Sequence, residues 1–125
     1  MVNYPDFIQS AEQLLKIGDE MGYRNAVSRA YYALYHRCLP LFNEINDHPA
    51  DDHHAQVVRT LYQQPQYKSI ANRLNKLRKR RNTADYELHK TFSRYDAESA
   101  VKMAQRAIAE LASVGWVENP PNHIS

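Results

Sequence analysis

Regular apolar spacing over residues 24–43 is the feature that most limits how this chain can fold. Side chains three and four residues apart lie on one face of an α-helix, whereas strands alternate every second residue. Apolar or aromatic residues also occur on neighbouring faces of this segment, so we expect a central helix that contacts several others. Its main face consists of Val27, Tyr31, Leu34, Cys38 and Leu41.

Similar spacing predicts four further helices, at about residues 6–18, 52–62, 66–86 and 96–113, with Asp51 or Asp52 capping the short one and Asp96 capping the last. The chain has 3 glycines and no sustained strand alternation, which argues against a β-sandwich or barrel. We therefore predict an all-α, up-and-down bundle of four main helices plus one short helix over residues 1–114, followed by a tail at 115–125.

The composition also bears on the setting of the protein. No apolar run approaches the roughly 20 residues of a membrane-spanning helix, and residues 1–6 do not resemble a signal peptide. Cys38 is the single cysteine, so no internal disulfide can form, and we interpret it as a small buried apolar residue rather than a nucleophile. These features favour a cytoplasmic protein without membrane contact.

Positive charge is concentrated in one part of the chain. Between residues 53 and 84 there is no Asp or Glu, although the net charge of the whole chain is only +2. Such a block attracts polyanions, although a basic run can also be a solvated helix face. We expect these side chains to converge on one nucleic-acid-binding cleft, and the candidate residues are Arg73, Lys76, Arg78, Lys79 and Arg80.

Arg81 interrupts the apolar face of the helix predicted at 66–86. That face is formed by Ile70, Leu74, Leu77, Ala84 and Leu88. A guanidinium on a packed face costs several kcal/mol unless it is paired or used. Asp85 stands one turn later and can pair with it. The pair is either functional or a structural ion pair that fixes helix register or a dimer contact.

Two segments together resemble the HEPN family, small helical bundles named for nucleotide binding in prokaryotes and higher eukaryotes. They are residues 26–36 (AVSRAYYALYH) and residues 81–86 (RNTADY) preceded by Leu77. The second fits an Arg-x-x-Ala-Asp-Tyr branch of the family, and His54 stands where that branch usually carries a histidine. The resemblance covers roughly residues 6–112.

The resemblance implies a homodimer in which the fourth-helix motifs of both protomers line one cleft. It also implies RNA or a nucleotide as the ligand. Many members are metal-independent ribonucleases that act as toxins or in defence against phage. A small nucleotidyltransferase encoded beside them often acts as the antitoxin.

The motif of active members is Arg, then four to six residues, then His. Here Arg81 and Asn82 match its start, but Tyr86 follows after four residues, and His89 follows only after seven. Metal-free RNA cleavage needs a base, a cation for the phosphorane and an acid. Arg81 suits the cation, Asn82 can orient it, and a phenol such as Tyr86 is a poor base at neutral pH.

We therefore assign as candidate catalytic residues Arg81, Asn82, Asp85, Tyr86 and His36, with Tyr32, His54 and His89 as further possibilities. Each histidine can instead be structural, and tyrosines at helical spacing are more often core residues than base-stacking platforms. The Asp- and His-rich segment 47–54 contains metal donors, but adjacent residues rarely converge on one ion, so we expect no metal and no cofactor.

Three hypotheses remain open at this point. The first is a metal-independent endoribonuclease. The second is a non-catalytic module that binds a nucleotide, an RNA or a partner nucleotidyltransferase, with Tyr86 as an acceptor of nucleotide transfer. The third is a dimerisation subunit in which Arg81 and Asp85 only hold the interface.

Overall fold

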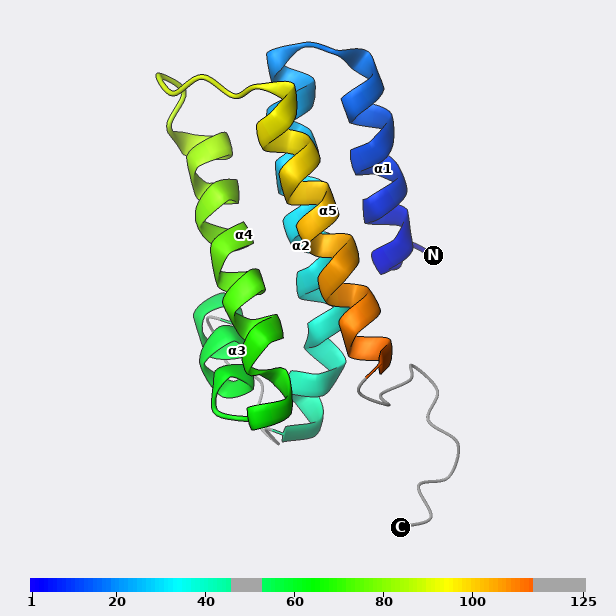
Figure 1. The fold of residues 1–125 in the computed structure, drawn as a ribbon, viewed down its shortest axis with the longest axis vertical. Helices are drawn as coiled ribbons and strands as arrows, with labels where there is room; N and C mark the ends of the chain where they lie inside the picture. The colour runs from blue at the N-terminus through cyan, green and yellow to red at the C-terminus, as the bar shows by residue number, and fades with distance from the viewer. Residues whose placement is uncertain (46–52, 114–125) are drawn as a thin grey trace.

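The computed structural model describes residues 1–45 and 53–113, and these residues form helices joined by short turns and loops (Figure 1). The elements are α1 (Tyr4–Ile17), α2 (Glu20–Ile45), α3 (His53–Tyr62), the 3-10 helix η1 (Pro65–Tyr67), α4 (Lys68–Tyr86) and α5 (Arg94–Ser113). The long helices α1, α2, α4 and α5 alternate in direction, and α3 packs beside the first turns of α4. The predicted all-α bundle is confirmed. The division at residue 114 stays a prediction, because the tail lies outside the described residues.

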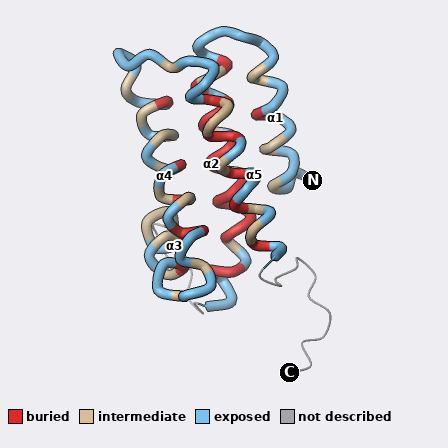
Figure 2. Tube along the Cα trace, in the orientation of Figure 1, coloured by how far each residue is buried: buried red, intermediate tan, exposed pale blue. Residues whose placement is uncertain are grey.

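Helix α2 lies at the centre of the bundle and contacts α1, α3, α4 and α5. Its predicted apolar face is fully or almost fully buried, as are the alanines of α5 that pack closely against it. Figure 2 shows buried positions along α2 and on the inward sides of α4 and α5. No helix in the described part of the chain is long and apolar enough to cross a membrane.

The starts of α2 and α5 differ from the prediction because caps, rather than periodicity, set them. Gly18 takes the left-handed conformation (φ 80°) and ends α1, and the Asp19 carboxylate then accepts a hydrogen bond from the Gly22 N–H at 2.7 Å. Before α5, the Ser93 N–H donates to Asp96 Oδ2 at 2.9 Å, and the Asp96 N–H donates to Ser93 Oγ at 3.2 Å. Ser93 is therefore the cap, and Asp96 completes a capping box from the third helical position.

Gly22 brings the start of α2 close to α1. A Cβ at this position would lie 2.8 Å from the Leu14 carbonyl oxygen and 3.0 Å from Asp19 Oδ1. Both distances are too short for a Cβ, so an alanine here would require the neighbouring atoms to move. The absence of a side chain at Gly22 thus sets how closely the first two helices pack.

Arg24 fixes the end of α4 and the loop that follows it. Its side chain is 4% exposed, its guanidinium lies 4.8 Å from the Phe92 ring centroid, and its Nε is 3.2 Å from Glu20 Oε2. Its terminal nitrogens donate hydrogen bonds to the carbonyl oxygens of Thr83, Ala84, Glu87, Leu88 and Lys90. Arg24 thus satisfies the Ala84 carbonyl in the last turn of α4 and ties the following loop to α2. The predicted apolar face stops at Ala84, because α4 ends at Tyr86 and Leu88 is exposed in the loop.

Candidate phosphate-binding site

Arg81 points from α4 toward α2, and its side chain is only 12% exposed. Its Cζ lies 5.4 Å from the ring centroid of Tyr31 and 5.5 Å from that of Tyr32. Asp85 is its ion-pair partner, with 3.6 Å between Nη1 and Oδ2, a long separation for a charge-assisted contact. Within the described residues, the buried Nε has no hydrogen-bond partner. The guanidinium is therefore held by ring faces and is only weakly neutralised.

His54, at the start of α3, joins the aromatic side chains of α2 beside Arg81. Its ring stacks on Tyr35 at 4.5 Å, and its Nδ1 is hydrogen-bonded to the Tyr31 hydroxyl. We refer to Arg81, Tyr31, Tyr32, Tyr35 and His54 as the Arg81 cluster. It combines side chains of α2, α3 and α4 in one place.

Burial raises the pKa of the Tyr31 phenol, and this effect outweighs the opposing charges of Arg81 and Arg78. Tyr31 therefore keeps its proton at neutral pH, and its hydroxyl shares a hydrogen bond with Nδ1 of His54. This bond fixes the orientation of the His54 ring beside the tyrosines of α2.

His36 lies one turn beyond Tyr32 on α2, at an exposed position. Its ring stacks on Phe7 of α1 at 5.0 Å and lies 6.2 Å from the Tyr32 ring. Partial burial lowers the pKa of His36, so its imidazole is neutral and able to accept a proton at physiological pH. His36 and Arg81 of one chain therefore both lie beside the Tyr32 ring.

The remaining predicted catalytic residues occupy the end of α4 and the loop beyond it. Tyr86 is 72% exposed, yet its ring centroid is 6.0 Å from Arg81 Cζ. Asn82 is exposed on the turn next to Arg81. His89 lies in the exposed loop near Glu87, apart from the cluster. The predicted metal-donor segment lies outside the described residues from 47 to 52, and the described part of the chain contains no group of metal ligands.

Within one chain the basic residues lie on different sides of α4, and their convergence on a cleft between two protomers stays a prediction. Arg78 is half-buried on the side of Tyr31, and its Nη2 is 3.3 Å from Asn75 Oδ1. The other four candidates, Arg73, Lys76, Lys79 and Arg80, line hollows between α4 and α5. Successive residues of a helix point about 100° apart, so a run of neighbouring cations cannot share one face.

Sequence reasoning missed Arg24 and the hydrogen bond between Tyr31 and His54. Arg24 stands at the start of α2, where a basic residue resembles any solvated surface charge. The contact of Tyr31 with His54 joins residues 23 positions apart, and no local pattern indicates it. Arg81, in contrast, could be identified from the sequence, because it is an arginine on an otherwise apolar face of its helix.

Comparison with known proteins identifies the family of the chain. The protein-family model described as HEPN domain matches residues 5–114. No curated protein and no solved structure matched the chain. The family match covers every described helix except the first residue of α1, including both segments on which the resemblance was based. The chain belongs to the HEPN domain family.

Proposed function

We propose that this protein is a metal-independent endoribonuclease whose active site is a cleft shared by two copies of the chain. HEPN domains act as ribonucleases or as nucleotide-binding modules. The observation that carries the proposal is the environment of Arg81, whose side chain is 12% exposed, lies on tyrosine rings and forms a long ion pair with Asp85. A phosphate offers this guanidinium the two parallel hydrogen bonds that Asp85 does not supply.

The chemistry is an attack by the ribose 2′-hydroxyl on the adjacent phosphorus. The bond between the 2′ oxygen and phosphorus forms as the bond to the 5′ oxygen breaks, which gives a 2′,3′-cyclic phosphate and a free 5′-hydroxyl. Arg81 stabilises the charge on the non-bridging oxygens. His36 takes the 2′-hydroxyl proton, and the exposed phenol of Tyr86 gives a proton to the leaving 5′ oxygen.

Among the described contacts, His36 and Arg81 each touch Tyr32 of the same chain but not each other, which favours a shared cleft. A base must come within hydrogen-bond reach of the proton that it takes. We therefore place His36 of one protomer against the phosphate held by Arg81 of its partner. A symmetric dimer would contain two such sites.

The first test is cleavage of single-stranded RNA by the purified protein in excess chelator. Arg81→Ala should lower the rate by about 100-fold or more, the usual effect of removing a group that stabilises transition-state charge. Arg94→Ala is the matched control, because Arg94 is an exposed arginine in an ion pair with Glu98 on α5. Equal rates for wild type and Arg81→Ala would contradict the proposal.

Mixing two inactive variants tests the shared cleft. A hybrid dimer of Arg81→Ala and His36→Ala has one intact site if the two groups come from different chains. After subunit exchange, about half of the dimers are hybrids with one working site of two, so about a quarter of wild-type activity should return. No recovery would place both groups in one chain.

A second candidate function is binding without catalysis, and one observation favours it. The position that carries histidine in active motifs is occupied here by Tyr86, whose exposed hydroxyl is accessible as an acceptor of a nucleotidyl group. This candidate predicts RNA or nucleotide binding that Arg81→Ala weakens, with no cleavage by the wild type. If Arg81→Ala lowers only dimer stability and leaves ligand affinity unchanged, the purely structural role is correct instead.

A further inference from the structure

A basic groove runs between α4 and α5, away from the Arg81 cluster. Two hollows, each of about 360 Å³, share Tyr95 and Ser99 and so form one continuous surface. Helix α4 contributes Arg73, Lys76, Lys79 and Arg80, and α5 with its preceding loop contributes Lys90, Lys102 and Arg106. We call the surface defined by these seven cations and Tyr95 the α4–α5 groove.

The groove concentrates the positive charge of the molecule. Its lining contains two carboxylates, Asp96 and Glu98, against the seven cations. The whole chain has 16 Lys and Arg and 14 Asp and Glu, so the rest of the chain carries nine cations against twelve carboxylates and is net negative. A surface of one sign on a molecule of opposite remaining charge attracts and orients a polyanion.

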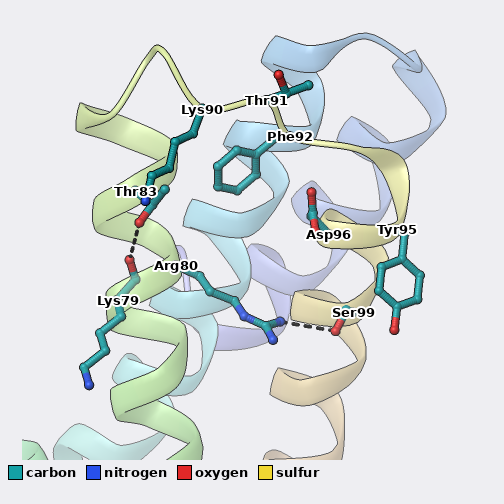
Figure 3. Close-up of a pocket in the computed structure, with 9 residues that line it drawn as sticks. All are labelled: Lys79, Arg80, Thr83, Lys90, Thr91, Phe92, Tyr95, Asp96 and Ser99. Carbon is teal, nitrogen blue, oxygen red and sulfur yellow. Dashed lines mark hydrogen bonds between the residues drawn. The ribbon is translucent and has the colours of Figure 1, made fainter.

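Two contacts across the groove hold α4 and α5 together. Arg80 Nη1 donates to Ser99 Oγ at 3.2 Å, and Figure 3 shows its side chain reaching from α4 across to α5. Further along, Arg73 Nη1 lies 3.4 Å from Glu110 Oε1. The lysines of the groove are exposed, and Lys90 among them is paired with Glu87 at 3.4 Å. The groove therefore has two arginines held by partners and a rim of exposed lysines.

Tyr95 is the feature that distinguishes this groove from a plain basic patch. It is 76% exposed, and it borders both hollows from the first turn of α5. A phenol ring left so open has no packing role and offers a face for stacking. Unpaired nucleic-acid bases stack on such rings, whereas the bases of a duplex are already stacked on one another.

We propose that the α4–α5 groove binds single-stranded RNA, with the backbone phosphates along its cations and one base on Tyr95. Naming RNA as the polyanion rests on the proposed function. From Tyr95 to Arg106, α5 alone extends about 16 Å, enough for more than one phosphate. Because Arg80 and Arg81 are consecutive on α4, the groove approaches the Arg81 cluster around one side of that helix. It acts as a second RNA contact outside the cleavage site.

The test compares binding of a fluorescent, unstructured RNA oligonucleotide, an RNA duplex and inorganic polyphosphate to full-length variants. Tyr95→Ala should weaken single-stranded RNA at least about fivefold, the lower end of the effect of one stacked base. It should leave polyphosphate binding unchanged, because polyphosphate has no base. Tyr62→Ala is the control, since Tyr62 is a partly exposed tyrosine on α3.

Charge reversal tests the cationic rim separately. Lys102→Glu should weaken both RNA and polyphosphate and reduce the salt dependence of binding. Lys16→Glu is its control, because Lys16 is an exposed lysine on α1 outside the groove. The groove is contradicted if Tyr95→Ala and Tyr62→Ala bind single-stranded RNA equally, or if Lys102→Glu is no worse than Lys16→Glu. Equal affinity of the wild-type protein for duplex and single-stranded RNA would also contradict the proposal.

The same variants separate this inference from the proposed function. Cleavage that depends on Arg81 but is unaffected by the groove variants would overturn the groove alone. Binding that depends on Tyr95 and Lys102, with no cleavage by the wild type, would overturn the nuclease and support the groove.

Discussion

At the scale of the residue, the choice of arginine at position 81 has a specific physical reason. A guanidinium is planar and more weakly hydrated than an ammonium, so it can lie on Tyr31 and Tyr32 with little water around it. Its positive charge is only partly neutralised, because Oδ2 of Asp85 lies 3.6 Å from Nη1, which is a long distance for an ion pair. Lysine would keep the charge but lose both the stacking and the two parallel hydrogen bonds to phosphate.

The pKa of His36 gives a prediction at the same scale. Burial lowers this pKa from 6.5, which favours the neutral imidazole, so the base is active above the lowered pKa and is lost as the pH falls through it. The cleavage rate should therefore persist to lower pH than an unperturbed imidazole, with its pKa of about 6.5, would allow, and decrease as the pH falls through the lowered pKa.

The measurement is a pH–rate profile beside an NMR titration of the His36 ring. Phe7→Ala should move the pKa of His36 back toward 6.5, because the Phe7 ring stacks on the imidazole. The pKa in urea-unfolded protein is the reference. A pKa of His36 at or above 6.5 in the folded protein would contradict the effect of burial. A pH–rate profile that His36→Gln leaves unchanged in shape would exclude His36 as the base.

At the scale of the element, the packing of α1 on α2 depends on one glycine. Alanine is the better helix former by about 1 kcal/mol, so propensity alone predicts that Gly22→Ala stabilises the protein. The steric effect has the opposite sign, because the new Cβ would lie 2.8 Å from a backbone oxygen that cannot rotate away. Overpacking of this kind costs about 1–3 kcal/mol.

We expect Gly22→Ala to lower the free energy of unfolding by about 1 kcal/mol, since the steric cost exceeds the gain in propensity. Urea unfolding followed by circular dichroism measures it. Asn25→Ala is the control, because Asn25 is exposed on the same helix and its replacement should be neutral or slightly stabilising. A more stable Gly22→Ala protein would show that α1 and α2 can separate at no cost.

The elements also show what the sequence could and could not predict. Apolar spacing identified every helix of the bundle, because periodicity marks the face that is buried. It misplaced the starts of α2 and α5, because those depend on the hydrogen bonds of Asp19 and Ser93 rather than on any buried face. Arg81 was predictable as an exception to an apolar pattern, whereas Arg24 fits its local surroundings and is explained only by carbonyls 59 or more residues away.

At the scale of the whole molecule, α2 is the element on which all other helices pack, and α4 presents different chemistry on its two sides. The side toward α2 carries a buried cation among tyrosines, and the side toward α5 carries exposed cations. The proposed cleavage site and the proposed groove thus lie on different sides of the same helix.

The reactivity of Cys38 measures whether the helical bundle remains folded. It is fully buried on α2, and burial raises the pKa of its thiol to about 12. The thiolate is the form of cysteine that attacks thiol reagents, so Cys38 of the native protein should not react with them. The labelling rate should rise with urea together with the loss of helical circular dichroism.

The control is Ser113→Cys in a Cys38→Ala background, which should label at once because the end of α5 is exposed. Fast labelling of Cys38 in native buffer would mean that α2 is exposed without global unfolding.

The attachment of the loop after α4 has a consequence for how freely that loop can change. Arg24 holds residues 87, 88 and 90 through their main-chain oxygens, and these are present whatever amino acid supplies them. The side chains of residues 87–90 can accordingly be substituted while the backbone conformation of the segment is retained. One buried anchor thus leaves the side chains around it available for new specificities.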